Sequence, residues 1–142
     1  MLDKTFLQRK LDSLSTYVDK LERLATRTDI AAIKKGDVTL DAIERNFQLA
    51  VDQMVDINTH IIKSGNFGTV DDLQSTFVML GDFEVLEKSF AKRIAPIVGV
   101  RNMLVHRYEK LDTDIFLTNL VNNFSDFKTY LIQINEYLRK IG

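Results

Sequence analysis

The chain has 142 residues, of which 45% are hydrophobic and 27% are charged, and its formal net charge is −1. This composition is that of an ordinary globular protein, and the length suits a single domain over residues 1–142. The near-neutral charge gives no global sign of nucleic-acid binding, and the absence of cysteine excludes disulfides and thiolate chemistry.

Two histidines without cysteine argue against a zinc site, so we expect no metal and no cofactor. The longest apolar runs fall far short of a membrane span. Residues 1–4 lack the basic-then-apolar order that opens a signal peptide. We therefore expect a cytoplasmic protein that does not associate with a membrane.

The apolar residues of three long segments recur every three to four positions, which predicts three amphipathic helices. Their apolar stripes are Leu7, Leu11, Leu14, Val18, Leu21 and Ala25; then Leu40, Ile43, Phe47, Ala50, Met54, Ile57 and Ile61; and finally Phe124, Phe127, Leu131, Ile134, Leu138 and Ile141. Residues 26–38 connect the first two helices, and Thr39 is the predicted cap of the second, which ends at the turn residues 64–68.

Shorter helices are expected between the second and the last long helix. Thr69 and Asp72 resemble a capping box for a third helix that carries Leu73, Phe77 and Leu80 and ends at Gly81. Asp82 can cap a fourth helix, which runs through Phe83, Leu86, Phe90 and Ile94, with a kink or restart at Pro96, and ends soon after His106. Asp112 or Thr113 would cap a fifth, and Asn122 and Asn123 separate it from the last. The pattern predicts an all-α up-and-down bundle of five to six helices, with Phe77, Phe83, Phe90, Phe124 and Phe127 in its core.

Residues 101–108 carry the densest set of functional side chains. Arg101, Asn102, His106 and Tyr108 interrupt an otherwise apolar segment. A guanidinium binds phosphate oxygens through a fixed fork of donors, and an imidazole moves protons near neutral pH. These are the groups that chemistry on a phosphodiester requires. A core histidine bonded to a carbonyl and a structural arginine ion pair are the alternative readings.

Helix geometry constrains how these groups can cooperate. Each residue advances about 100° around a helix, so Asn102 and His106 share a face whereas Arg101 and His106 diverge by about 140°. Either the helix ends or distorts near His106, and the long arginine bends around, or two copies of the segment meet in a symmetric dimer and form one shared cleft. We favour a homodimer through the motif helix, because isologous dimers are the commonest assembly.

A local excess of basic residues surrounds the motif. Residues 88–110 contain Lys88, Lys92, Arg93, Arg101, Arg107 and Lys110 against the single acid Glu109. Such a run is either a solvated helix face or a surface for an anionic ligand, and its position beside the motif leaves both readings open. His60 lies four residues after Asp56, and packing is the favoured reading because no further ligands accompany it. The acidic pairs at 71–72 and 112–114 lie at predicted helix starts, where they serve as caps.

The extended pattern of arginine, four residues, histidine, one residue and tyrosine resembles the signature of HepT-like toxins in the HEPN superfamily. Further likeness spans most of the chain, at residues 44–48, 56–62, 98–102 and 108–112. Pro96 departs from the family pattern and bears on how straight the helix before the motif is.

The resemblance implies a helical-bundle homodimer that acts as a metal-independent endoribonuclease, the toxin of a type VII toxin-antitoxin system. On that basis Arg101 and His106 are the expected catalytic residues at the dimer interface, with Asn102 either supporting His106 or serving as an ordinary helix residue. It also implies a MntA-like nucleotidyltransferase antitoxin as partner, which silences the toxin by adenylylation of Tyr108. Without the resemblance, Tyr108 would be read as a tyrosine packed at a helix end. The alternative is a non-catalytic HEPN domain that binds nucleotide or serves as the partner module of a nucleotidyltransferase.

Overall fold

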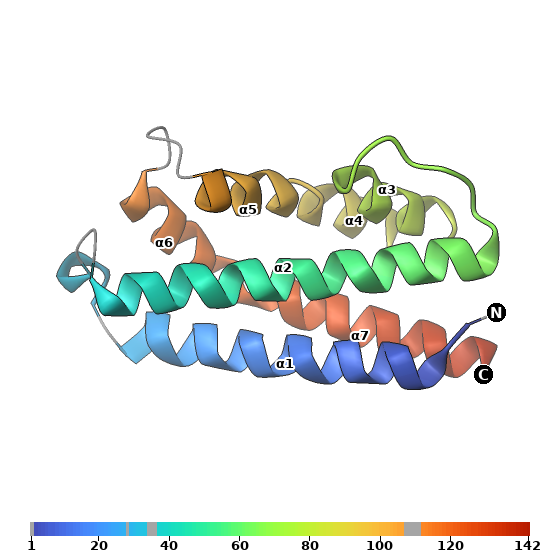
Figure 1. Cartoon of the computed structure of the whole chain (residues 1–142), viewed down its shortest axis with the longest axis horizontal. Helices are drawn as coiled ribbons and strands as arrows, with labels where there is room; N and C mark the ends of the chain where they lie inside the picture. The colour runs from blue at the N-terminus through green and yellow to red at the C-terminus, as the bar shows by residue number, and fades with distance from the viewer. Residues whose placement is uncertain (1, 28, 34–36, 107–111) are drawn as a thin grey trace.

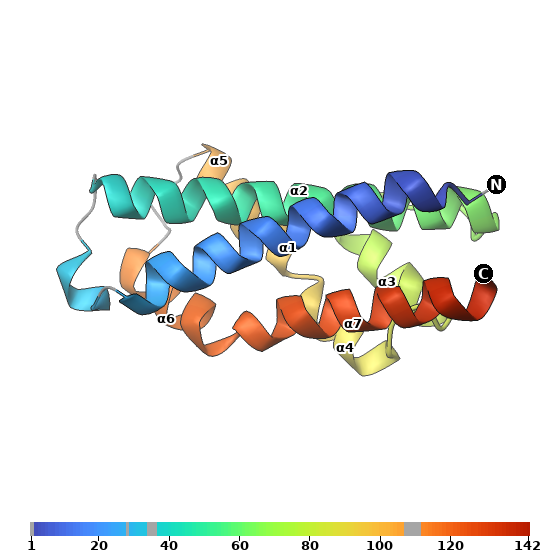
Figure 2. The same ribbon diagram turned by 90° about the horizontal axis from the view of Figure 1, so that it is seen from below.

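The computed structural model describes residues 2–27, 29–33, 37–106 and 112–142, and these form a bundle of helices in four antiparallel runs (Figure 1). The elements are α1 (Lys4–Arg27), a 3-10 turn η1 (Ile30–Ala32), α2 (Val38–Gly65), α3 (Gln74–Asp82), α4 (Lys88–Ile94), α5 (Ile97–His106), α6 (Thr113–Asn122) and α7 (Phe124–Ile141). The first two runs are α1 and α2, the third contains α3 to α5, and the fourth contains α6 and α7. Both chain ends therefore lie at the same end of the bundle, and α1 runs between α2 and α7 (Figure 2). The all-α up-and-down prediction is confirmed.

The predicted stripes form the core because each long helix turns one apolar face inward. Every residue of the α1 and α2 stripes is buried. In α7 the stripe is buried at Phe124, Phe127 and Ile134, but Ile141 is 48% exposed, since it lies in the last turn beyond the packed region. No helix in the described part of the chain is long and apolar enough to cross a membrane.

The structure changes three of the predicted caps. Asp82, the predicted cap of the fourth helix, is the last residue of α3, and α4 follows Glu87. The cap of α2 is Asp37, whose Oδ1 accepts from the Thr39 backbone N–H at 2.8 Å, and not Thr39 itself. The capping box predicted for Thr69 and Asp72 was wrong, because α3 begins only at Gln74 and Asp72 Oδ1 accepts instead from the Ser75 backbone N–H at 2.7 Å. Asp112 caps α6.

The segment between α3 and α4 corrects the predicted start of the fourth helix. Phe83 and Leu86 lie in a turn and not in a helix, because Glu84 has a φ of 61°, which no α-helix accommodates. The backbone N–H groups of Val85 and Leu86 both donate to the Leu80 carbonyl, which closes the turn. Phe83 is 48% exposed and stacks on Phe67 with ring centroids 4.2 Å apart, so its placement in the core was wrong.

Close packing and a proline shape the third run. A Cβ on Gly81 would lie 2.7 Å from the Ala91 Cβ, so glycine lets α3 and α4 approach. The restart predicted at Pro96 is confirmed, because α4 ends at Ile94 and α5 begins at Ile97. One predicted helix is therefore two.

A buried polar network joins α2, α3 and α7. The Tyr130 hydroxyl lies 2.6 Å from Asn58 Oδ1 and 3.1 Å from the Met54 carbonyl oxygen. Asn58 Nδ2 donates to Thr76 Oγ1 at 3.1 Å, and that hydroxyl donates to the Leu73 carbonyl. Burial raises the pKa of Tyr130 well above its usual value of 10.0, so its hydroxyl stays protonated.

Candidate active site on the motif helix

α5 carries the three described motif residues on a regular helix. Val98 and Leu104 are buried and hold the helix against the bundle. Because α5 is helical from Ile97 to His106, no distortion separates Arg101 from His106, and their divergence of about 140° persists. Asn102 and His106 are exposed on one face, whereas Tyr108 lies outside the described residues.

Arg101 turns toward α2, where it is held by a carboxylate. Its Nε donates to Asp52 Oδ1 at 2.9 Å, and its Nη1 donates a longer hydrogen bond of 3.4 Å to Asn102 Oδ1. The side chain of Arg101 is 29% exposed and that of Asp52 is 42% exposed. The Arg101 side chain is therefore held by Asp52 and Asn102 and is partly exposed to solvent.

Arg101 and Asn102 border a groove between α5, α2 and α1, lined by both charged and apolar side chains, which we call the α5–α2 groove. Its volume is about 720 Å³. It is lined by Phe6, Lys10, Val51, Asp52, Val55, Asp56, Thr59, His60, Lys63, Leu73, Val98, Arg101 and Asn102. A hollow of this size beside a guanidinium has room for a phosphate and its attached sugar.

His60 lies in the same groove, and its contacts fit the packing role expected from the sequence. Its Nε2 accepts from the Asp3 backbone N–H at 2.9 Å, and its ring lies against Phe6 with centroids 4.9 Å apart. Since Nε2 accepts, a neutral ring carries its proton on Nδ1. These contacts attach the start of α1 to the end of α2.

Three of the described basic residues around the motif lie beside carboxylates. Arg93 pairs with Asp126 at 3.1 Å, Lys88 lies 3.9 Å from Asp82, and Arg101 pairs with Asp52. Arg93 lines a different cavity from Arg101. Carboxylates therefore neutralise three of these cations, while Arg107 and Lys110 lie outside the described residues.

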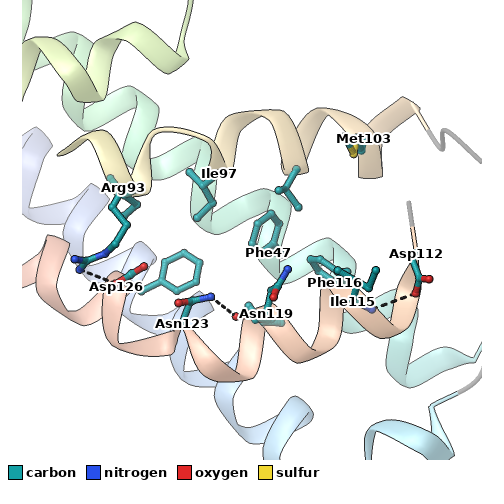
Figure 3. Close-up of a pocket in the computed structure, with 14 residues that line it drawn as sticks. Phe47, Arg93, Ile97, Met103, Asp112, Ile115, Phe116, Asn119, Asn123 and Asp126 are labelled. Atoms are coloured by element: carbon teal, nitrogen blue, oxygen red, sulfur yellow. Dashed lines mark hydrogen bonds and ion pairs between the residues drawn. The ribbon is translucent and has the colours of Figure 1, made fainter. Parts of the chain in front are cut away.

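The other side of α5 faces an apolar cavity against α6 and α7, which we call the α5–α6 cavity (Figure 3). It measures about 370 Å³, and Ile97, Val100 and Met103 reach it from α5. Arg93 and Asp126 lie at one end, and Met103 and Asp112 lie at the other (Figure 3). Arg101, Asn102 and His106 do not line it, so its chemistry is separate from that of the motif.

Sequence reasoning missed Asp52 as the partner of Arg101. The two residues are 49 positions apart, and Asp52 sits among the buried residues Val51 and Met54 as an ordinary polar residue of an amphipathic helix. No pattern in the sequence distinguishes it from Asp56 one turn later. Within residues 2–27, 29–33, 37–106 and 112–142, no group of three or more His, Cys, Asp or Glu side chains could hold a metal ion.

Comparison with known proteins places this arrangement in a family. The family model described as Ribonuclease HepT-like matches residues 14–134. The chain is 28% identical over 140 residues to the tRNA nuclease HepT of Aphanizomenon flos-aquae, covering 96% of this chain and 92% of that protein. It is 26% identical over 98 residues to the mRNA nuclease HepT of Shewanella oneidensis, covering 68% and 74%.

The fold matches a solved structure described as the tri-AMPylated Shewanella oneidensis HEPN toxin in complex with MNT antitoxin. The TM-score is 0.77 at 19% identity, with 92% of this chain and 96% of that chain covered. At this identity the match shows the fold.

Proposed function

Because this chain belongs to the HepT-like ribonuclease family, we propose that it is an RNA-cleaving toxin whose active site uses Arg101 and His106. The observation that carries the proposal is the motif helix itself, on which a guanidinium at the edge of a groove and an exposed imidazole lie five residues apart. The two related HepT nucleases act on tRNA and on mRNA respectively, which supports RNA as the substrate class.

The proposed reaction is an internal transesterification. The 2′-oxygen of a ribose attacks the adjacent phosphorus, the bond to the 5′-oxygen of the next nucleotide breaks, and the products are a 2′,3′-cyclic phosphate and a free 5′-hydroxyl. His106 takes the proton from the 2′-hydroxyl or supplies one to the leaving oxygen. Because the nucleophile belongs to the RNA, the reaction needs no metal-bound water and does not act on DNA.

Arg101 is the group that stabilises negative charge on the phosphate. A guanidinium has five N–H donors, of which Asp52 and Asn102 take one each, so three remain for phosphate oxygens. Two parallel donors suffice for the bidentate geometry that arginine forms with phosphate. The α5–α2 groove beside Arg101 supports a place for the scissile phosphate next to this guanidinium.

A homodimer would bring the histidine of one chain to the arginine of the other. Gly99, Asn102 and His106 follow the spacing of one helix face, and Asn102 and His106 are exposed. A Cβ on Gly99 would meet no atom within 4 Å, so the face is open at its centre and lets a second helix approach closely. Packing of two such faces about a two-fold axis would bring the two His106 side chains together. The Arg101 guanidinium, which donates to Asn102 Oδ1 at 3.4 Å, would reach this interface from its edge.

Control by a partner completes the proposal. A MntA-like nucleotidyltransferase would transfer adenylate from ATP to Tyr108: the phenolic oxygen loses its proton and bonds to the α-phosphorus, and pyrophosphate leaves. The tri-AMPylated state of the structurally similar HEPN toxin, in complex with its MNT antitoxin, supports this chemistry. The added phosphate would compete with RNA for Arg101. RNA and ATP as substrates would place the protein in the cytoplasm.

The test is incubation of the purified protein with total RNA in EDTA. The wild-type protein should yield fragments that end in cyclic phosphate. His106→Ala should abolish cleavage, and Arg101→Ala should reduce it by about 10²–10³-fold. His60→Gln is the matched control, because it changes the other histidine of the chain and keeps an acceptor for the Asp3 N–H.

Two results would reject this function. Strict dependence on added Mg²⁺ would contradict the mechanism, and full activity of His106→Ala would remove its central residue. Intact RNA with the wild-type protein would instead favour the non-catalytic reading, in which Arg101 and His106 bind a nucleotide or hold the dimer.

A further inference from the structure

Asp52 forms an ion pair with the arginine of the motif from another helix. Its Oδ1 accepts from Arg101 Nε at 2.9 Å. It projects from the middle of α2, the longest helix, where its neighbours Val51 and Met54 are buried and hold the backbone in place. The ion pair therefore joins two helices whose backbones are both held by buried neighbours, since Val98 and Leu104 hold α5 in the same way.

The atom that Asp52 engages determines what it does to Arg101. A bond to Nε, the inner donor, restrains the plane of the guanidinium and leaves its outer end, which carries one N–H of each Nη group, without contact to Asp52. A carboxylate that bound both outer nitrogens would instead occupy the donors that a phosphate needs. The Nε contact is thus compatible with phosphate binding and orients the group that performs it.

We propose that Asp52 is a positioning residue for RNA cleavage, which holds the Arg101 guanidinium ready for the charge that develops on the phosphate. This inference rests on the ribonuclease function proposed above. An arginine without this restraint samples many rotamers, and the loss of orientation at a reacting group lowers the rate. The negative charge of Asp52 also opposes phosphate binding, so its removal should slow turnover without weakening the affinity for RNA.

The two effects predict a divided response of kcat and KM. Asp52→Ala should lower kcat by about tenfold to a hundredfold, whereas the KM for RNA should stay the same or fall. Asp52→Asn keeps an acceptor oxygen for Nε and should recover part of kcat. In the Arg101→Ala background, Asp52→Ala should have no further effect on kcat, because its effect on kcat acts only through Arg101.

Asp56 provides the matched control. It lies one turn after Asp52 on α2 and lines the same groove, but it pairs with Lys10 Nζ at 2.9 Å. Asp56→Ala removes the same charge from the same helix face but keeps the bond between Asp52 and Arg101 Nε, so it should lower kcat much less than Asp52→Ala does. A fall in kcat that is equal in both variants would mean that a general charge effect, and not the orientation of Arg101, is responsible.

A second measurement tests the contact without relying on cleavage. In the wild-type dimer the Arg101 Nε–H proton should give an NMR signal protected from exchange, identified by its absence in Arg101→Lys. The signal should be lost in Asp52→Ala and kept in Asp56→Ala. If wild type cleaves no RNA, the proposed function fails while this signal still reports on the contact.

Three results would overturn the inference. Unchanged kcat in Asp52→Ala, with wild type and Asp56→Ala both active, would show that Arg101 needs no restraint. An increase in kcat would mean that Asp52 holds Arg101 away from the phosphate. Persistence of the protected Nε–H signal in Asp52→Ala would mean that another group orients the guanidinium.

Discussion

Replacement of Tyr130 by phenylalanine would remove one oxygen atom from a polar network that joins three helices. The Tyr130 side chain is fully buried, and its hydroxyl lies 2.6 Å from Asn58 Oδ1. Met54, the second acceptor, lies inside α2, where the helical ladder supplies a partner for its carbonyl. The cost therefore falls on Asn58, whose buried oxygen would lose its partner.

A buried acceptor without a partner costs about 1–3 kcal/mol. For a chain of this length, that loss corresponds to a fall in Tm of roughly 3–9 °C. Thermal and urea unfolding followed by circular dichroism would measure both quantities. Tyr137→Phe is the control, because it makes the same change in α7 at a side chain that is only partly buried. Equal free energies of unfolding for Tyr130→Phe and wild type would show that the Tyr130–Asn58 hydrogen bond does not stabilise the fold.

The raised pKa of Tyr130 adds a second, independent readout at alkaline pH. In the unfolded chain a tyrosine releases its proton near pH 10, whereas burial keeps Tyr130 protonated in the folded chain. The unfolded state then binds fewer protons, so stability falls as pH rises above about 10, by up to about 1.4 kcal/mol per pH unit. Below that pH the shift has no effect. Tyr130→Phe lacks this loss, so its stability deficit relative to wild type should shrink above pH 10; a constant difference would contradict the assigned burial.

Three further predictions concern assembly, control and packing. A purified mixed dimer of Arg101→Ala and His106→Ala chains should recover about half of the wild-type rate if each active site draws on both chains. The same dimer should be inactive if each site lies within one chain. Light scattering should give twice the chain mass of 16.3 kDa. Tyr108→Phe should keep most of the cleavage but resist silencing by the nucleotidyltransferase and ATP, and intact-mass spectrometry should find adenylate on the wild type only. Gly81→Ala should cost about 1–3 kcal/mol in urea unfolding, because the added Cβ would lie 2.7 Å from that of Ala91; unchanged stability would mean that α3 and α4 can separate freely.

Prediction from the sequence succeeded wherever local signals act alone. The stripes of α1 and α2, the restart at Pro96 and the cap at Asp112 each follow from periodicity or from the backbone chemistry of one residue. The prediction from the sequence failed between α3 and α4. There Phe83 fits the spacing of a helical stripe, but its ring stacks on Phe67 in the turn after α2. A contact between two loops has no periodic signature, and the tertiary contact outweighs the weak helical propensity of a short segment.

The sequence by itself determined the fold class and the segment that holds Arg101, Asn102, His106 and Tyr108, because each depends on composition or on short spacing. Only the tertiary structure decided what surrounds them. It placed α2 beside α5, so that Asp52 lies against Arg101 Nε and both residues line the α5–α2 groove. The other face of α5 lines the apolar α5–α6 cavity. Residues 49 positions apart meet because two helices pack, and helix packing depends on the summed burial of many side chains that no local pattern encodes.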